Sequence, residues 1–84
     1  MAINIEKILT ISARDWAEIN GVRLRDYEAQ GVHENSFIID ILKKFSEKVP
    51  AEAEVVIDYR VSSAGDSTYT RAYACGTALI PKLF

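Results

Sequence analysis

The chain contains very little cysteine, histidine or proline. Among its 84 residues there are one cysteine, Cys75, one histidine, His33, and two prolines. A lone cysteine cannot form an internal disulfide, and two such side chains are too few for a zinc cluster within one chain. No stretch approaches ~18 consecutive apolar residues, and the N-terminus lacks a charged region followed by an apolar one. We therefore expect a cytoplasmic protein with no membrane partner.

Motifs for catalysis and for nucleic-acid binding are also missing. Lys plus Arg number 10 and Asp plus Glu number 12, and a formal net charge of −2 without a basic run argues against a nucleic-acid partner. The four glycines are scattered, so no phosphate-binding glycine loop is present. No nucleophile stands in a recognised elbow, and His33 has no triad partners by motif. The sequence therefore predicts a protein that is not an enzyme.

Apolar residues, in contrast, are plentiful for so short a chain. They make up 49% of the sequence. We expect residues 1–84 to form a single domain, which at this size buries only ~60–65% of its unfolded surface. Apolar area beyond the needs of one small core suits contact with a partner subunit. The composition therefore predicts a homo-oligomer.

The first part of the chain is interpreted as a strand followed by a hairpin. Ile3–Ser12 is rich in isoleucine and partly alternates, as a strand does. The Asn20-Gly21 step suits a type I′ turn, and a two-residue loop there sets Trp16 opposite Arg25. A helix through Arg14–Ile19 is the competing interpretation, because its residues have adequate helix propensity. The matching apolar faces of the two strands favour the hairpin.

The remainder is interpreted as one helix and a long hairpin. Tyr27–Glu34 lacks periodicity and indicates a connection or an irregular strand. Apolar residues recur at helical spacing through Asn35–Val49. Ala53–Ser62 and Thr68–Ile80 alternate as strands do, around a turn at Ala64-Gly65. The fold class is therefore α+β, a mostly antiparallel sheet of four to five strands with one helix packed on one face, in the order strand, hairpin, helix, long hairpin.

The register of the long hairpin decides which residues share a face. A two-residue turn pairs Asp58 with Arg71, Val61 with Thr68, and Val56 with Tyr73. Small residues on the second strand then let the helix lie close to the sheet. One helix cannot cover so many strands, so the other face meets solvent, a ligand or another subunit.

Two stretches share the order and spacing of a known family. The first contains Ile8–Ser12, Gly21–Tyr27 and Gly31–Glu34, and the second runs from Ala51 to Lys82 with Gly76–Ala78 as its most characteristic step. They resemble the YbjQ family of small proteins, which are labelled heavy-metal-binding and have selenium-binding relatives in archaea. The resemblance implies an oligomeric ring, often a pentamer, and a soft metal or a selenium species as ligand. The segment before the helix is shorter here than in many relatives.

A weaker likeness, to the flavin-binding dodecins, covers only the order of strand, helix and hairpin. Dodecins stack flavin on a tryptophan near the start of their second strand. No tryptophan stands in the corresponding strand here, so this likeness implies less than the first.

The candidate ligand-binding residues are aromatic and basic side chains in two clusters. Such clusters stack a planar ring and hold a phosphate through bidentate arginine bonds. The same residue types are enriched at subunit contacts, and for the long hairpin the interface is the favoured interpretation. The residues are Trp16, Arg23 and Arg25 in the first hairpin, and Arg60, Tyr69 and Arg71, with Tyr73, in the second.

The candidate metal ligands are Cys75 and His33. One thiolate per subunit, gathered around a symmetry axis, suits a thiophilic metal or a selenium species. A free cysteine is more often a buried small hydrophobe, and His33 on a loop is more often solvated than bound to metal. One histidine in each chain makes a metal site only if symmetry supplies others.

Together these observations predict a non-enzymatic, oligomeric protein that binds or sequesters a small ligand between subunits. The ligand is a soft metal or selenium species at Cys75, as the resemblance implies, or an anionic nucleotide-like molecule held by the arginines and Trp16. The alternative is a structural module that forms a ring and docks a protein partner without a small ligand. An enzyme would need a carboxylate or a histidine with a perturbed pKa in an intersubunit cleft.

Overall fold

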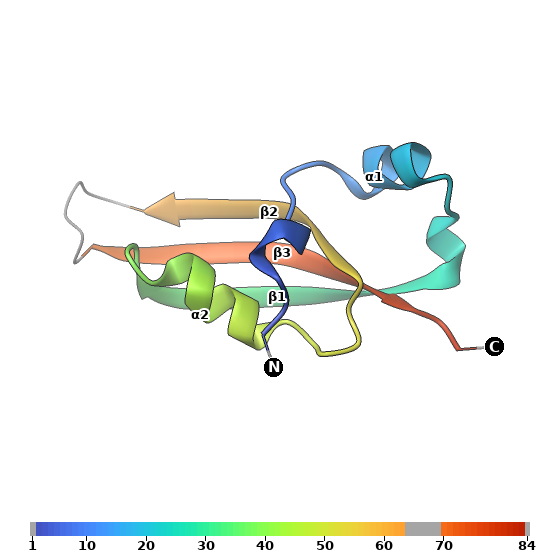
Figure 1. The fold of residues 1–84 in the computed structure, drawn as a ribbon. Coiled ribbons are helices and arrows are strands. Elements are labelled where there is room, and N and C mark those ends of the chain that lie inside the picture. The colour runs from blue at the N-terminus through green and yellow to red at the C-terminus, as the bar shows by residue number, and fades with distance from the viewer. Residues whose placement is uncertain (1, 64–69, 84) are drawn as a thin grey trace.

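The computed structural model describes residues 2–63 and 70–83. Within them lies a three-stranded antiparallel sheet in the order β1-β3-β2, with two α-helices and two short 3₁₀ helices (Figure 1). In chain order the elements are η1 (Ile5–Lys7), α1 (Ala13–Asn20), η2 (Leu24–Asp26), β1 (Tyr27–Phe37), α2 (Ile41–Lys48), β2 (Val55–Ser63) and β3 (Arg71–Pro81). The predicted α+β class and antiparallel sheet are confirmed. The described residues contain three strands and two α-helices instead of the expected four to five strands and one helix.

The N-terminal segment is not the predicted strand. Asn4 caps η1, its side-chain oxygen accepting a bond of 3.0 Å from the Glu6 N–H. After η1 the chain becomes extended and runs along β2, with a parallel bridge from Ile8 to Val56 and a bond of 2.8 Å from the Leu9 N–H to the Val56 carbonyl. The segment therefore acts as a short cover on the outer edge of β2 and not as a full strand.

The predicted first hairpin is wrong, and the competing helix is present as α1. The Ser12 hydroxyl caps its start by accepting a bond of 3.2 Å from the Asp15 N–H. Gly21 ends the helix in the left-handed conformation, with φ of 64°. Asn-Gly tolerates positive φ in either setting, so the dipeptide alone does not distinguish a helix end from a hairpin turn.

The first strand of the sheet is regular and ends later than the periodicity predicts. Tyr27–Phe37 forms the strand β1, whereas the sequence indicates a connection or an irregular strand for Tyr27–Glu34. Asn35 pairs with Tyr73 and Phe37 with Arg71 in the β1–β3 ladder. Because these residues belong to the ladder, α2 starts at Ile41 and not at the predicted residue 35.

The predicted register of the long hairpin is also wrong. Val61 lies opposite Ala74 and not Thr68, and Ser63 lies opposite Ala72. The expected Asp58–Arg71 and Val56–Tyr73 pairs therefore do not form. The predicted turn at Ala64-Gly65 lies outside the described residues.

A β-bulge at Asp58 divides β2 into two halves. The β2–β3 register shifts between Ile57 and Arg60, and Asp58 has a positive φ of 57°. The Asp58 N–H donates to the Ile11 carbonyl at 2.9 Å, outside the β2–β3 ladder. A bulge adds one residue and reverses which face the following side chains point to.

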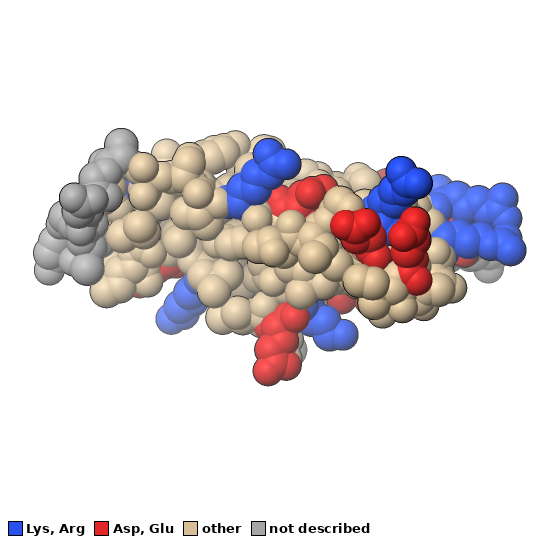
Figure 2. Space-filling view, turned by 90° about the horizontal axis from the view of Figure 1, so that it is seen from above, with Lys and Arg blue, Asp and Glu red and all other residues tan. Residues whose placement is uncertain are grey.

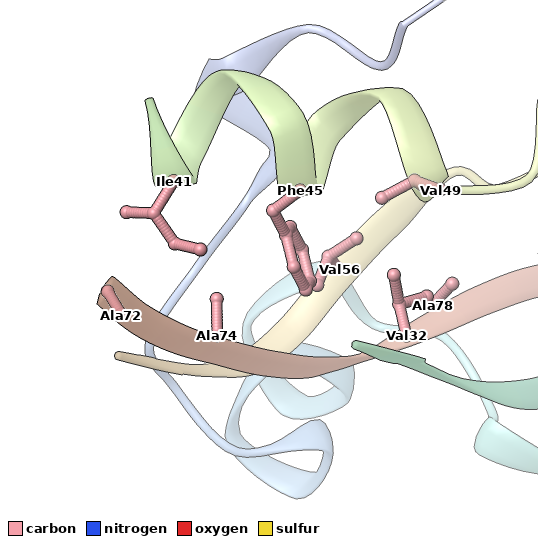
Figure 3. Close-up of a cluster of buried hydrophobic side chains, with 8 residues drawn as sticks. All are labelled: Val32, Ile41, Phe45, Val49, Val56, Ala72, Ala74 and Ala78. Carbon is pink, nitrogen blue, oxygen red and sulfur yellow. The ribbon is translucent and has the colours of Figure 1, made fainter. Parts of the chain in front are cut away.

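The main core lies between α2 and one face of the sheet. Phe45 is fully buried and makes an edge contact with Tyr59, ring centroids 4.8 Å apart. Ile41, Phe45 and Val49 point from the helix toward the alanines of β3 (Figure 3). As expected, the small side chains of this strand let the helix lie close, and burial of the Phe45 ring contributes about 2–3 kcal/mol. The core residues are Val32, Ile41, Phe45, Val49, Val56, Ala72, Ala74 and Ala78.

A second, smaller core lies on the opposite face at one end of the sheet. There α1 packs Trp16 and Ala17 against Val55, Ile57 and Leu79. Figure 1 shows α1 toward the end of the sheet at which the C-terminus emerges. No described helix is long and apolar enough to cross a membrane.

We expect Gly76→Ala to lower the free energy of unfolding by about 1–3 kcal/mol, the usual cost of overpacking a core. A Cβ at this position would lie 2.8 Å from Val56 Cγ1 and 3.1 Å from Phe45 Cζ. Urea denaturation followed by circular dichroism measures the effect. The control is Gly31→Ala, whose Cβ would meet only His33 Nε2, at 3.7 Å, and which should change stability by less than about 0.5 kcal/mol. Equal effects of the two substitutions would contradict this packing.

Candidate functional site

The candidate site is the part of the sheet surface that faces away from α2 and is not covered by α1. We call it the open face and define it by His33, Arg60, Arg71, Tyr73 and Cys75. Since Ala72 and Ala74 point to α2, the alternating residues Arg71, Tyr73 and Cys75 point to the opposite side. Their cross-strand partners share that side, because residues opposite each other in a ladder lie on one face.

The ladder brings three of the predicted site residues into one row across the sheet. Cys75 on β3 lies opposite His33 on β1 and also opposite Arg60 on β2. The bulge at Asp58 makes this possible, because it turns Arg60 to the open face and Tyr59 to the face of α2. The thiol, the imidazole and the guanidinium thus come from three strands to one place.

His33 and Tyr73 form a stacked and hydrogen-bonded pair. Tyr73 Oη lies 2.6 Å from His33 Nδ1, and the two rings are 5.8 Å apart at an angle of 28°. This bond occupies Nδ1, while Nε2 lies at the Gly31 side of the ring. Tyr73 is 44% exposed, so the pair presents a fixed aromatic surface to solvent.

Arg71 lies over an aromatic ring at the end of the open face. Its guanidinium carbon is 5.3 Å from the centre of the Phe37 ring, and Nη2 donates to the Asn35 carbonyl at 3.3 Å. A guanidinium has five N–H donors. Among the described residues this one makes a cation–π contact and one hydrogen bond.

Two shallow pockets open on this face and meet at the His33–Tyr73 pair. The bulge pocket, of about 290 Å³, is lined by Gly31, His33, Asp58, Arg60, Cys75, Gly76 and Thr77. The arginine pocket, of about 300 Å³, is lined by Asn35, Ser62, Ser63, Arg71, Ala72 and Tyr73. Each therefore holds one arginine together with hydroxyl, amide or thiol groups.

The other predicted site residues lie elsewhere or are not described. Trp16 is only 7% exposed and packs edge-on against Tyr27, ring centroids 5.5 Å apart. Because the predicted hairpin does not form, Trp16 is not a cross-strand neighbour of Arg23 or Arg25. Tyr69 lies outside the described residues.

Arg23 and Arg25 are exposed near the opposite end of the molecule from the open face. Arg23 lines a pocket of about 430 Å³ together with Asp26, Tyr27 and Lys82. Figure 2 shows basic side chains gathered at the end where α1 and η2 lie in Figure 1. This larger pocket is a separate surface and shares no lining residue with the open face.

The two predicted metal ligands are neighbours, but they are only two. His33 and Cys75 lie opposite each other in the ladder and line the same pocket. No group of three His, Cys, Asp or Glu side chains suited to a metal ion occurs within residues 2–63 and 70–83. One chain therefore offers a metal ion a pair of soft ligands in its described part.

Sequence reasoning missed the contributions of Gly31, Asp58 and Thr77. A glycine inside a strand is a signal of close approach, and Gly31 leaves the space into which the His33 ring extends. Asp58 carried no such signal, because a bulge with positive φ at a non-glycine residue depends on the neighbouring segment. Thr77 was missed because its place in the bulge pocket follows from the β2–β3 register, which could not be predicted from the sequence.

The buried carboxylate Glu34 is not arranged as a general acid. The hydrogen bond from the Ser36 hydroxyl lowers its pKa most, and Lys48, with Nζ 3.1 Å from Oε1, lowers it further against the opposing effect of burial. A general acid at neutral pH needs the reverse, a raised pKa. Glu34 also lies on the α2 side of the sheet, away from the open face.

We expect Glu34→Gln to lower stability at neutral pH by about 0.5–1 kcal/mol, the range for an ion pair whose lysine is exposed. Because the pKa is lowered in the folded protein, the stabilisation is present above the ordinary value of 4.5 and is lost as the pH falls below it. The difference between wild type and variant should therefore shrink between pH 5 and pH 3. Urea denaturation at each pH tests this, with the exposed Glu28→Gln as control. A difference independent of pH would exclude the charge as its cause.

No protein-family model matches the chain, and neither the curated proteins nor the solved structures include a significant match. The likenesses to the YbjQ family and to the dodecins therefore remain predictions. The functional interpretation rests on the residues of the open face and their geometry.

Proposed function

We propose that this is a non-enzymatic, oligomeric protein that binds a small anionic ligand with a planar ring, such as a nucleotide, on the open face between subunits. The observation that carries the proposal is the arrangement of two arginines on either side of an exposed aromatic pair. Arg60 lies in the bulge pocket, Arg71 lies in the arginine pocket, and His33–Tyr73 lies between them.

Both arginines are available to an anion. The ion pairs among the described residues are Arg14–Glu18 and Lys48–Glu34, and neither includes Arg60 or Arg71. The Asp58–Arg71 pair that would have neutralised one of them does not form. Arginine binds phosphate and carboxylate groups through paired N–H bonds, which are the stronger class of protein hydrogen bonds.

The aromatic pair supplies a stacking surface beside those charges. The hydrogen bond between Tyr73 Oη and His33 Nδ1 fixes the orientation of both rings. Stacking of one base on an aromatic side chain contributes about 1–3 kcal/mol. Hydroxyls of Ser62, Ser63 and Thr77 at the pocket edges suit the polar groups of such a ligand.

A second candidate ligand is a soft metal or selenium species at Cys75. What favours it is the position of His33 directly opposite Cys75 in the ladder, in the same pocket. Thiolate and imidazole are the ligands that soft and borderline metals prefer. Arg60 lies in that pocket too, and its positive charge favours an anionic selenium species over a free metal cation.

If the arginines hold the anion, Arg60→Ala and Arg71→Ala should each weaken binding of adenosine triphosphate roughly 10- to 100-fold, as expected for a lost charge-assisted hydrogen bond. Isothermal titration calorimetry at low and high salt measures the affinity, which should fall with salt. Arg14→Ala is the matched control, since this exposed arginine pairs with Glu18 on α1. Equal binding by all variants would refute the proposal.

Two substitutions of Tyr73 separate stacking from charge in the same assay. Tyr73→Phe keeps the ring and loses the hydroxyl, whereas Tyr73→Ala loses both. Tyr73→Ala should weaken binding of adenosine triphosphate but not of inorganic triphosphate.

Loss of the oligomer in the arginine variants would instead favour the structural module without a small ligand.

For the soft-metal candidate, Cys75→Ser should abolish binding of Cd²⁺, and His33→Gln should weaken it. The thiolate–cadmium absorbance in the ultraviolet reports binding directly. The secondary structure and the oligomer should be unchanged in both variants, because both side chains lie on the open face. Retention of full Cd²⁺ binding by Cys75→Ser would rule this ligand out at Cys75.

A further inference from the structure

The two outer edges of the sheet differ in whether another segment of the chain covers them. The edge of β2 is covered by the segment after η1, with hydrogen bonds of 2.8 to 3.0 Å that join Leu9 and Ile11 to the backbone of β2. The edge of β1 has no such cover, because within residues 2–63 and 70–83 this strand pairs with β3 alone. Figure 1 shows β1 as the outermost strand on its side.

The edge of β1 carries few of the features that block pairing with another strand. Proteins protect bare edges with charged side chains, above all lysine, and with proline, bulges or very short strands, and of these β1 has only the carboxylates Glu28 and Glu34. β1 is eleven residues long, contains no lysine and no proline, and pairs with β3 without a register shift from Tyr27 to Phe37. β2, in contrast, carries the bulge at Asp58. The edge of β2 is therefore covered and irregular, whereas the edge of β1 is uncovered, long and regular.

We propose that β1 pairs antiparallel with β1 of a second copy of this chain, with Val32 on the two-fold axis. The axis stands perpendicular to the sheet, because a symmetric antiparallel pair keeps the same face of both sheets on one side. Opposite residues must therefore share a face, which limits the registers to those centred on a residue. The one centred on Val32, the midpoint of the strand, pairs all eleven residues.

Charge and size also favour this register over its neighbours. It places Glu28 opposite Ser36 of the second copy and Tyr27 opposite Phe37, an aromatic pair of a kind worth about 0.2–1 kcal/mol. It also places the large His33 opposite Gly31, which has no side chain. Centring the pair on Gly31 would instead set Glu28 against Glu34, two like charges.

The pairing deepens the proposed function and rests on the oligomer named there. It joins the two sheets into six strands with both α2 helices on one side and both open faces on the other. Gly31 and His33, which line the bulge pocket, come to lie next to the axis. The open face thus becomes continuous across the two copies. A ligand bound there can contact both subunits, as the proposed function requires.

The test is a pair of charge variants, Ala29→Lys/Asn35→Lys and Ala29→Glu/Asn35→Glu. Both positions are exposed, and the proposed register places residue 29 of one copy directly opposite residue 35 of the other. Wild type should sediment with at least twice the 9.4 kDa chain mass. Each variant alone should sediment as a monomer, and an equimolar mixture of the two should recover the dimer. The matched control, Ile19→Lys/Ala51→Lys, adds the same charge at exposed positions outside β1 and should behave as wild type.

Hydrogen exchange on the same samples separates loss of pairing from loss of folding. Alternate β1 amides point toward β3 and toward the proposed partner strand, and in wild type both sets should be protected from exchange. In the Lys variant the set that points toward the partner should exchange fast, while the amides of β3 stay protected. Wild type that sediments as a monomer overturns the interface and the oligomer together, and adenosine triphosphate binding by that monomer would leave the ligand proposal standing. A Lys variant that remains assembled, or a mixture that fails to recover the dimer, overturns the interface alone.

Discussion

The structure depends first on the contact between Phe45 and the flat surface of β3. The ring is fully buried and reaches across Gly76 to Val56 and Tyr59 on the neighbouring strand. It can do so only because β3 presents glycine and alanine on this side. One aromatic side chain thereby fixes the helix to the two strands that it spans. Since α2 takes up the apolar residues of this face, the opposite side of the same strands is left to polar, aromatic and basic residues.

The bulge at Asp58 decides what the opposite side displays. In a regular strand Arg60 would point into the core beneath α2 and Tyr59 toward solvent. The extra residue exchanges the two. A positive φ at a residue other than glycine costs about 1–3 kcal/mol, and the hydrogen bonds of Asp58 and Tyr59 to the Ile11 and Leu9 carbonyls offset it. The cover on the β2 edge and the position of Arg60 in the site are thus parts of one arrangement.

The sequence allowed the fold class, the main helix and the two strands β2 and β3 to be predicted, because the helix and both strands have a periodic apolar pattern, which Tyr27–Glu34 of β1 lacks. It did not reveal α1, since Asn20-Gly21 suits a helix end as well as a turn. It placed the strand partners wrongly. Val61 pairs six residues further along β3 than predicted, an even shift that keeps the same residues on each face, whereas Val56 pairs five residues further along, an odd shift that exchanges the faces. Arg60, Arg71, His33 and Cys75 were therefore identified as candidates by residue type, while their meeting on one face followed from a register and a bulge that tertiary contacts set. Trp16 was misjudged for the same reason, since its burial comes with α1.

The open face adjoins the bare edge of β1, because His33 of the open face lies on this strand, and this has an energetic consequence. A ligand bound next to the proposed two-fold axis would contact the paired form better than the single chain, so its binding would stabilise the pair by mass action. Conversely, the proposed pairing would hold the strand that carries His33 and Gly31 and reduce the cost of ordering these residues when the ligand binds. An 84-residue chain buries too little surface to be very stable alone. Extending the sheet through β1, as proposed, would add main-chain hydrogen bonds at the edge where they are missing.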